Sequence, residues 1–109
     1  MNWLVVAAAL SGALAVGAGA FGAHGASGVA AAWLKTGGEY QLIHAVAALV
    51  AVQMGARGAG WLFVGGALVF SGTLYLMALG LPKWLGAVTP IGGLMLIAGW
   101  LWLAWAAAR

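Results

Sequence analysis

Side chains that can do chemistry are scarce in this sequence, and most of them fall in one region of it. The candidate site residues, which carry imidazole, carboxylate, phenol, amide or hydroxyl groups, are His24, Glu39, Tyr40, Gln41, His44 and Thr89. Two histidines and a glutamate can supply three ligands of a zinc site or the steps of a proton relay. However, no compact pattern such as HExxH joins them, and nothing in their spacing sets the two imidazoles on opposite sides of a cavity for haem. We therefore predict no metal site and no cofactor.

An enzymatic site is not predicted either. No serine or lysine occurs in a recognisable nucleophile pattern, and the chain contains no cysteine. Thiol nucleophiles, disulfides and thiolate metal sites are thereby excluded. The four basic residues are scattered singly along the chain, which is too few for a nucleic-acid surface. We expect a protein that is not an enzyme, has no catalytic residue and has no nucleic-acid partner.

Composition indicates where the protein resides. Of its 109 residues, 66% are hydrophobic and only 5% are charged, so the chain cannot form a soluble domain with a polar surface. A helix needs roughly 20 residues to cross a hydrocarbon core of about 30 Å. Four apolar runs in the sequence approach this length. The predicted spans are residues 3–21, 39–54, 60–79 and 84–107. Short turns between them predict an all-α, antiparallel four-helix bundle in the membrane, with residues 1–109 as a single domain.

Two segments between the spans are irregular. After the first span, Ser27 followed by "GVAAAWLK" predicts a short helix with an N-cap that lies along the membrane surface. Before the fourth span, Pro90 leaves two alternatives. Either Thr89 caps a helix that begins at Pro90, or the helix begins near Pro82 and kinks at Pro90.

The polar side chains are predicted to gather at one end of the bundle. His24 ends the first span, Glu39 to His44 occupy the first turns of the second, and Thr89 belongs to the turn into the fourth. Our favoured interpretation is a structural network, because irregular backbone in a membrane needs hydrogen-bond partners. The alternative is a cluster of His24, Glu39 and His44 that moves protons or a cation.

Small residues recur at helical spacing and predict where helices touch, because they let backbones approach closely in lipid. These residues are Ser11, Ala15 and Gly19 in the first span, Ala67, Ser71 and Gly72 in the third, and Gly92 and Gly99 in the fourth. The simplest interpretation is packing within one bundle, and contact between copies of the chain is the alternative.

Four motifs, in order along nearly the whole chain, resemble those of a known family. They are "GAFGAHG" from Gly19, "YQLIHA" from Tyr40, "FSGTLY" from Phe70 and "TPIGG" from Thr89. The chain resembles the small membrane proteins of domain-of-unknown-function family 423, which are related to eukaryotic transmembrane protein 256. The resemblance implies a four-helix protein of bacterial inner membranes, with no established activity or ligand.

Together these observations predict a multi-pass structural or accessory component of a membrane assembly. Its partners are expected to be the lipid bilayer and either further copies of itself or a larger membrane complex. The alternative function is a minimal transporter or channel subunit for protons or a cation. Arg57, in a very short loop, favours an orientation with both termini in the cytoplasm.

Overall fold

The computed structural model describes all residues from 1 to 109, and it is entirely helical. Its elements, in chain order, are α1 (Trp3–His24), α2 (Gly28–Gln53), α3 (Arg57–Ala78), the 3-10 helix η1 (Lys83–Ala87) and α4 (Thr89–Ala108). The predicted all-α class with four main helices is confirmed.

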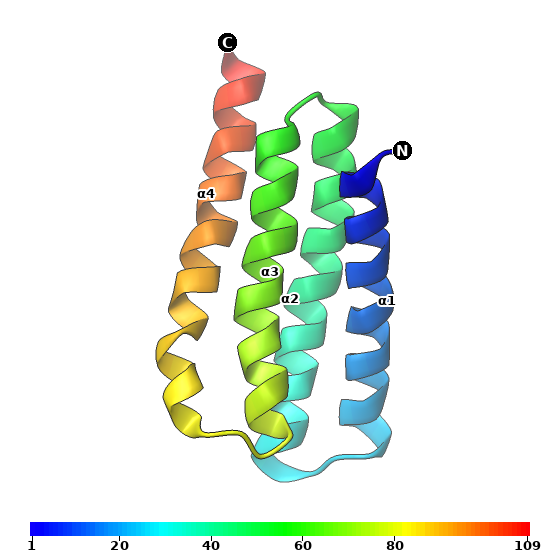
Figure 1. Cartoon of the computed structure of the whole chain (residues 1–109), viewed down its shortest axis with the longest axis vertical. Helices are drawn as coiled ribbons and strands as arrows, with labels where there is room; N and C mark the ends of the chain where they lie inside the picture. Colours follow the sequence, from blue (N-terminus) through cyan, green and yellow to red (C-terminus); the bar gives the residue numbers. More distant parts are fainter.

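The helices lie side by side in the order in which they occur in the chain (Figure 1). α2 and α3 are central, α1 packs mainly on α2, and α4 packs on α3. Figure 1 shows that each turn reverses the chain, so both termini lie at the end where α2 passes into α3. At that end the Arg57 guanidinium donates to the Asn2 side-chain oxygen over 3.4 Å. α1 and α4 therefore form the two edges of the fold.

The second helix starts earlier than predicted. The separate surface helix expected after Ser27 does not form, because the residues that follow are the first turns of a continuous α2. Its alanine-rich start favours helix, and Gly37 and Gly38 do not end it because both are covered by neighbouring helices. A Cβ atom at Gly38 would lie 3.1 Å from the Ala15 carbonyl oxygen of α1. The two glycines that come just before the predicted start of the span at residue 39 are therefore positions of close helix contact inside α2.

The chain enters α4 through η1, and Pro90 lies in the first turn of α4, where its missing amide removes no helical bond. This agrees with the alternative in which the helix begins at the proline. Thr89 is not the side-chain cap, however. Its hydroxyl donates to the Leu85 carbonyl oxygen at 3.3 Å and lies 2.6 Å from the Thr73 hydroxyl. Thr89 thus supplies a partner to a carbonyl group that precedes the proline.

α4 is held against α3 by close contacts at two glycines. A Cβ atom at Gly92 would collide with the Phe70 backbone and lie 2.7 Å from the Gly66 carbonyl oxygen. A Cβ atom at Gly99 would lie 2.7 Å from the Phe63 ring. Most of the small residues predicted to mark helix contacts are buried, namely Ser11, Ala15, Ala67, Ser71, Gly92 and Gly99. Only side chains this small permit such short distances between helices.

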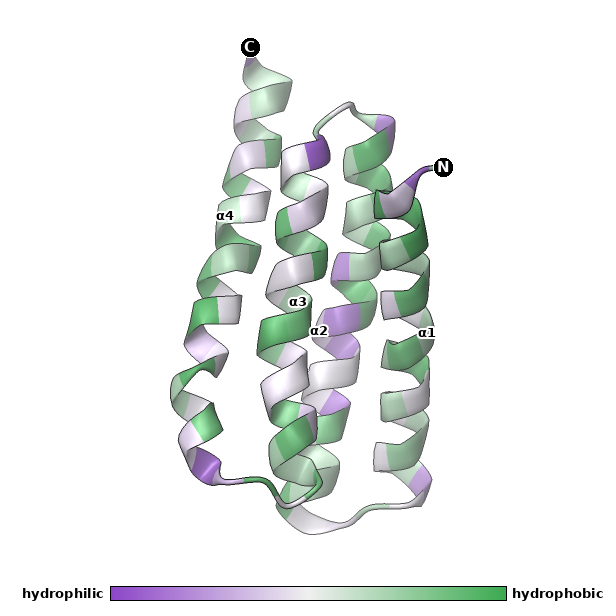
Figure 2. Cartoon of the chain, viewed as in Figure 1, coloured by the Kyte–Doolittle hydropathy of each residue, from purple (hydrophilic) through white to green (hydrophobic).

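Three stretches are long and apolar enough to cross a membrane, and they correspond to α1, α3 and the segment from η1 through α4. α2 is not among them, because hydrophilic residues lie halfway along it (Figure 2). It is nevertheless central, with nine buried residues against three in α4. The fold thus places its most polar long helix inside and its most apolar helix at an edge.

Candidate functional site

Gln41 lies at the middle of α2 and is 1% exposed. Its amide nitrogen donates to the Ser11 hydroxyl of α1 at 3.0 Å, and its carbonyl oxygen accepts from the Tyr75 hydroxyl of α3 at 2.7 Å. One turn earlier in α2, the Gly37 carbonyl oxygen accepts from the Ser71 hydroxyl at 2.7 Å. Because a buried amide is costly without partners, these bonds fix the relative alignment of α1, α2 and α3.

His44 is 6% exposed and uses both of its ring nitrogens. Nδ1 lies 2.6 Å from the Tyr40 carbonyl oxygen, and the Trp100 indole N–H of α4 donates to Nε2 over 3.1 Å. Since Nε2 accepts, the proton of a neutral imidazole is assigned to Nδ1, which donates to the carbonyl oxygen. The ring therefore connects α2 to α4 without needing a charge.

Aromatic rings enclose this imidazole. The Tyr40 ring stacks on the His44 ring with 6.1 Å between centroids and contacts Phe70 at 4.7 Å, and the Trp100 ring meets His44 edge-on at 5.9 Å. A cavity of about 440 Å³ beside them is bounded by residues of α2, α3 and α4. Its walls are aromatic and aliphatic, so its surface suits an apolar group better than an ion.

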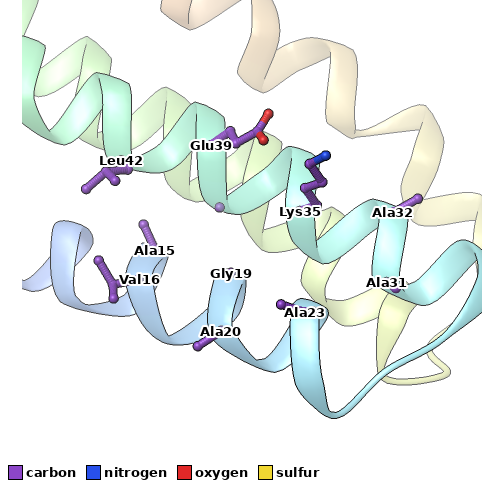
Figure 3. A pocket seen from close by; sticks show the side chains of 12 residues that line it. Ala15, Val16, Gly19, Ala20, Ala23, Ala31, Ala32, Lys35, Glu39 and Leu42 are labelled. Carbon is purple, nitrogen blue, oxygen red and sulfur yellow. The ribbon is translucent and has the colours of Figure 1, made fainter.

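Glu39 lies on another face of α2 from His44. It borders a groove of about 580 Å³ between α1 and α2, together with Lys35, and Figure 3 shows the two side chains next to each other along α2. The neighbouring residue Gly38 packs against Ala15 and Gly19 of α1. Glu39 is therefore about 10 Å inside the end of α1 at 1.5 Å per residue.

The predicted grouping of His24 with the polar residues of α2 is wrong. His24 is exposed at the last turn of α1 and makes no side-chain hydrogen bond. The cause is the early start of α2, which moves Glu39 and His44 away from the turn. His44 lies about 24 Å from the first residue of α2, and not in the first turns of that helix as predicted. No group of three or more potential metal-ligating side chains forms.

The polar residues thus occupy separate places. Gln41 and His44 lie one turn apart in the buried middle of α2, Tyr40 lines the aromatic cavity, and Glu39 borders the groove on α1. Thr89 belongs to a local contact with Thr73 near the start of α4.

Sequence reasoning missed most of the partners. Tyr75 and Trp100 were not singled out, and Ser11, Ser71 and Thr73 were recognised only as small residues or as sparse polar groups along the helices, not as partners. A hydroxyl group on a helix face made of small residues indicates a hydrogen-bond partner, because such a face packs against another helix. Nothing in the sequence indicated that Trp100 lies opposite His44, since that depends on how far α4 is displaced along α3.

The chain is similar to known membrane proteins over almost its full length. A family model described as "Protein of unknown function (DUF423)" matches residues 18–93. The UPF0382 membrane protein YwdK of Bacillus subtilis is 37% identical over 121 residues, covering 100% of this chain and 98% of that protein. The UPF0382 inner membrane protein YgdD of Escherichia coli is 39% identical over 110 residues, covering 91% of this chain and 84% of that protein.

A third relative, the UPF0382 membrane protein SAB0533 of Staphylococcus aureus, is 39% identical over 114 residues and covers 94% of this chain and 93% of its own. No solved structure matches the chain. These matches confirm the family resemblance inferred from the four motifs.

Proposed function

Because the chain belongs to the DUF423 family of membrane proteins of unknown function, we propose that it is a structural or accessory component of a membrane assembly and not an enzyme. The observation that carries the proposal is how the polar groups of α2 are used. Gln41 bonds to α1 and α3, and His44 bonds to α4, so these groups hold the four helices together. No buried side-chain nitrogen or oxygen lacks a hydrogen-bond partner. Groups committed to internal bonds are not free to bind a substrate.

We further propose that all four helices cross the bilayer in alternating directions. α2 is long enough, since its 26 residues extend about 39 Å, and its neighbours shield its polar middle. The end with Arg57 and both termini would face the cytoplasm, in keeping with the bias of basic residues in short loops. Labelling of single cysteines placed at positions 57 and 83 from each side of the membrane tests this orientation. Modification of both positions from one side would contradict it.

A proton or cation transporter is the competing function, and substitution of His44 separates the two. In a structural role, His44→Gln keeps a neutral hydrogen-bonding group and largely preserves folding, whereas His44→Leu leaves the Trp100 N–H unpaired and lowers stability by about 1 kcal/mol. In a transport or metal-binding role, glutamine is as damaging as leucine, because an amide neither titrates near neutral pH nor ligates zinc as imidazole does.

The measurements are thermal unfolding in detergent, proton flux in liposomes and metal content, each compared between the parent and both variants. We expect unfolding to distinguish the variants while flux and metal content do not. A pH-driven flux or stoichiometric zinc that disappears in His44→Gln would contradict the structural role. Purification in mild detergent, with identification of co-migrating proteins, would then name the assembly.

A further inference from the structure

Two charged residues lie within the length of the packed helices, whereas Arg57, Lys83 and Arg109 lie at helix ends. They are Lys35 and Glu39, and both are exposed. A charge exposed to hydrocarbon is costly and in membrane proteins is almost always paired or turned toward protein. Nothing else in the chain covers these two side chains, so both are accessible to a partner outside the chain.

The surface around the two charges is shaped for another helix. The groove beside them is bounded mostly by alanine and glycine, with Ala20 and Ala23 contributed by α1 and Ala32 by α2 (Figure 3). Small residues allow close helix approach in lipid, which large side chains prevent.

Exposed residues continue this surface along α2 at alternating spacings of three and four. The members of this outward stripe are Lys35, Glu39, Leu42, Val46, Leu49 and Gln53. This is the spacing by which two helices pack along a shared seam. The groove and the stripe together form one continuous face made by α1 and α2.

We propose that this face binds a second copy of the chain, related by a two-fold axis perpendicular to the membrane, with Lys35 of each copy paired to Glu39 of the other. The inference rests on the assembly role proposed above and identifies its contact surface. A two-fold axis brings the same patch of both copies together, so a patch that carries one positive and one negative charge complements itself. Glu39 is the only acidic residue in the chain, so it is the only side-chain carboxylate that a second copy can offer to Lys35.

The pairing is sterically reasonable along the membrane normal. The two residues are one helical turn apart, which corresponds to about 6 Å of depth. The flexible four-carbon stem of lysine can span that offset. A crossing of the two α2 helices would reduce the offset further.

Exchange of the charges tests the pairing directly. Lys35→Glu carries two negative charges on this face and Glu39→Lys carries two positive charges, so each variant should associate with itself about tenfold more weakly or worse than the parent. Mixed together, the two variants should associate as the parent does, because each positive position then meets a negative one. The double variant Lys35→Glu/Glu39→Lys should also self-associate. Lys83→Glu, at a helix end outside the groove, is the matched control and should leave association unchanged.

Association is measured by energy transfer between donor- and acceptor-labelled copies in liposomes of phosphatidylethanolamine and phosphatidylglycerol, at several dilutions in lipid. The rival explanation is that Lys35 pairs with Glu39 of the same copy. Each single variant would lose that pair too, but mixing the two variants would not restore association. A parent that stays monomeric at every dilution, or a mixture that stays dissociated, overturns the inference. In that case phospholipid that co-purifies with the parent and is lost from Glu39→Lys would identify lipid as the occupant.

Ala20→Leu provides a second test should the charge variants fold poorly. Ala20 is exposed on α1, so leucine fills the groove without disturbing the packing of the chain itself. We expect association to fall about tenfold with both charges intact, and unchanged association would contradict the proposed surface. If the parent is monomeric and the His44 variants behave as expected, only this inference is overturned. If proton flux is present and is lost in His44→Gln, the proposed function is overturned.

Discussion

α2 and α4 differ in polarity, in burial and in the contacts that hold each of them in the bundle. α2 carries the polar residues Gln41 and His44, has nine buried residues and contacts helices on both sides. α4 is almost entirely apolar, has three buried residues and packs mainly on α3, with the bond from Trp100 to His44 as its connection to α2. In a soluble bundle the apolar helix would be central and the polar helix peripheral.

The difference shows which forces hold each helix. Lipid solvates an apolar helix as well as protein does, so α4 gains little by burying its leucines and is held by close backbone contact at glycine. Polar groups on α2 have no partners in lipid, so hydrogen bonds to its neighbours favour its central place. We therefore expect the free energy of unfolding to fall when side-chain size changes at the α4 contact, and when hydrogen-bonding groups are removed from α2.

The largest effect is expected at the α3–α4 contact. Gly92→Ala adds a methyl group that collides with the Phe70 backbone, which cannot move aside as a flexible side chain can. We expect a loss of about 1 to 3 kcal/mol in the free energy of unfolding, measured by titration with denaturing detergent. Gly93→Ala is the matched control, because its methyl group would meet the Phe70 ring at 3.8 Å, an ordinary contact distance. Equal stability of the two variants would refute the close-contact account of α4.

A smaller effect is expected in the polar middle of α2. Gln41→Leu removes the bonds to Ser11 and Tyr75 and leaves both hydroxyl groups without their partner. Side-chain hydrogen bonds between membrane helices contribute modestly, so the expected loss of unfolding free energy is about 1 to 2 kcal/mol.

The matched control for this change is Thr36→Val, at an exposed position of α2 outside the outward stripe, which should leave stability nearly unchanged. A double-mutant cycle with Ser11→Ala isolates the bond to α1. A coupling energy of zero in that cycle would mean that the Ser11 bond does not hold α1 to α2.

The smallest effect is expected on the outer face of α4. Leu101 is 66% exposed, so Leu101→Ala exchanges one lipid-solvated side chain for another and should change the free energy of unfolding by about 0.5 kcal/mol or less. The same detergent titration measures it. A larger loss would show that α4 also packs against another protein copy, and the contrast between α2 and α4 would no longer hold.

The sequence predicted the apolar parts of the fold better than its polar parts. The spans that correspond to α1, α3 and α4 were recognisable because a long run of apolar residues in a chain this hydrophobic forms a helix. The start of α2 was not, since the predicted span began at residue 39, after Gly37 and Gly38, and the sequence does not reveal the neighbours that cover these two glycines. Which glycines end a helix depends on tertiary contacts that a single sequence does not display.

Part of the candidate site was predicted, and the part that was missed also depends on tertiary contacts. Gln41 and His44 were identified from their residue types and their spacing of three, and both are buried as polar groups in a membrane must be. Their partners Tyr75 and Trp100 depend on how neighbouring helices are displaced along one another, which packing decides. His24 was grouped with them because the expected loop placed the start of the second helix too late.

The polar middle of α2 also has a consequence for how the protein is made. The hydroxyl groups of Ser71 and Tyr75 that bond to α2 belong to α3, which leaves the ribosome after α2 does. A newly made α2 therefore has only Ser11 of α1 available among the partners of its four side-chain bonds to other helices, and its composition is too hydrophilic for a lone span. On the four-span topology proposed above, we expect the stable entry of α2 into the bilayer to wait for α3, so that the two helices insert as a pair. The order of synthesis would then make the α2–α3 hairpin, and not the single helix, the unit of membrane insertion.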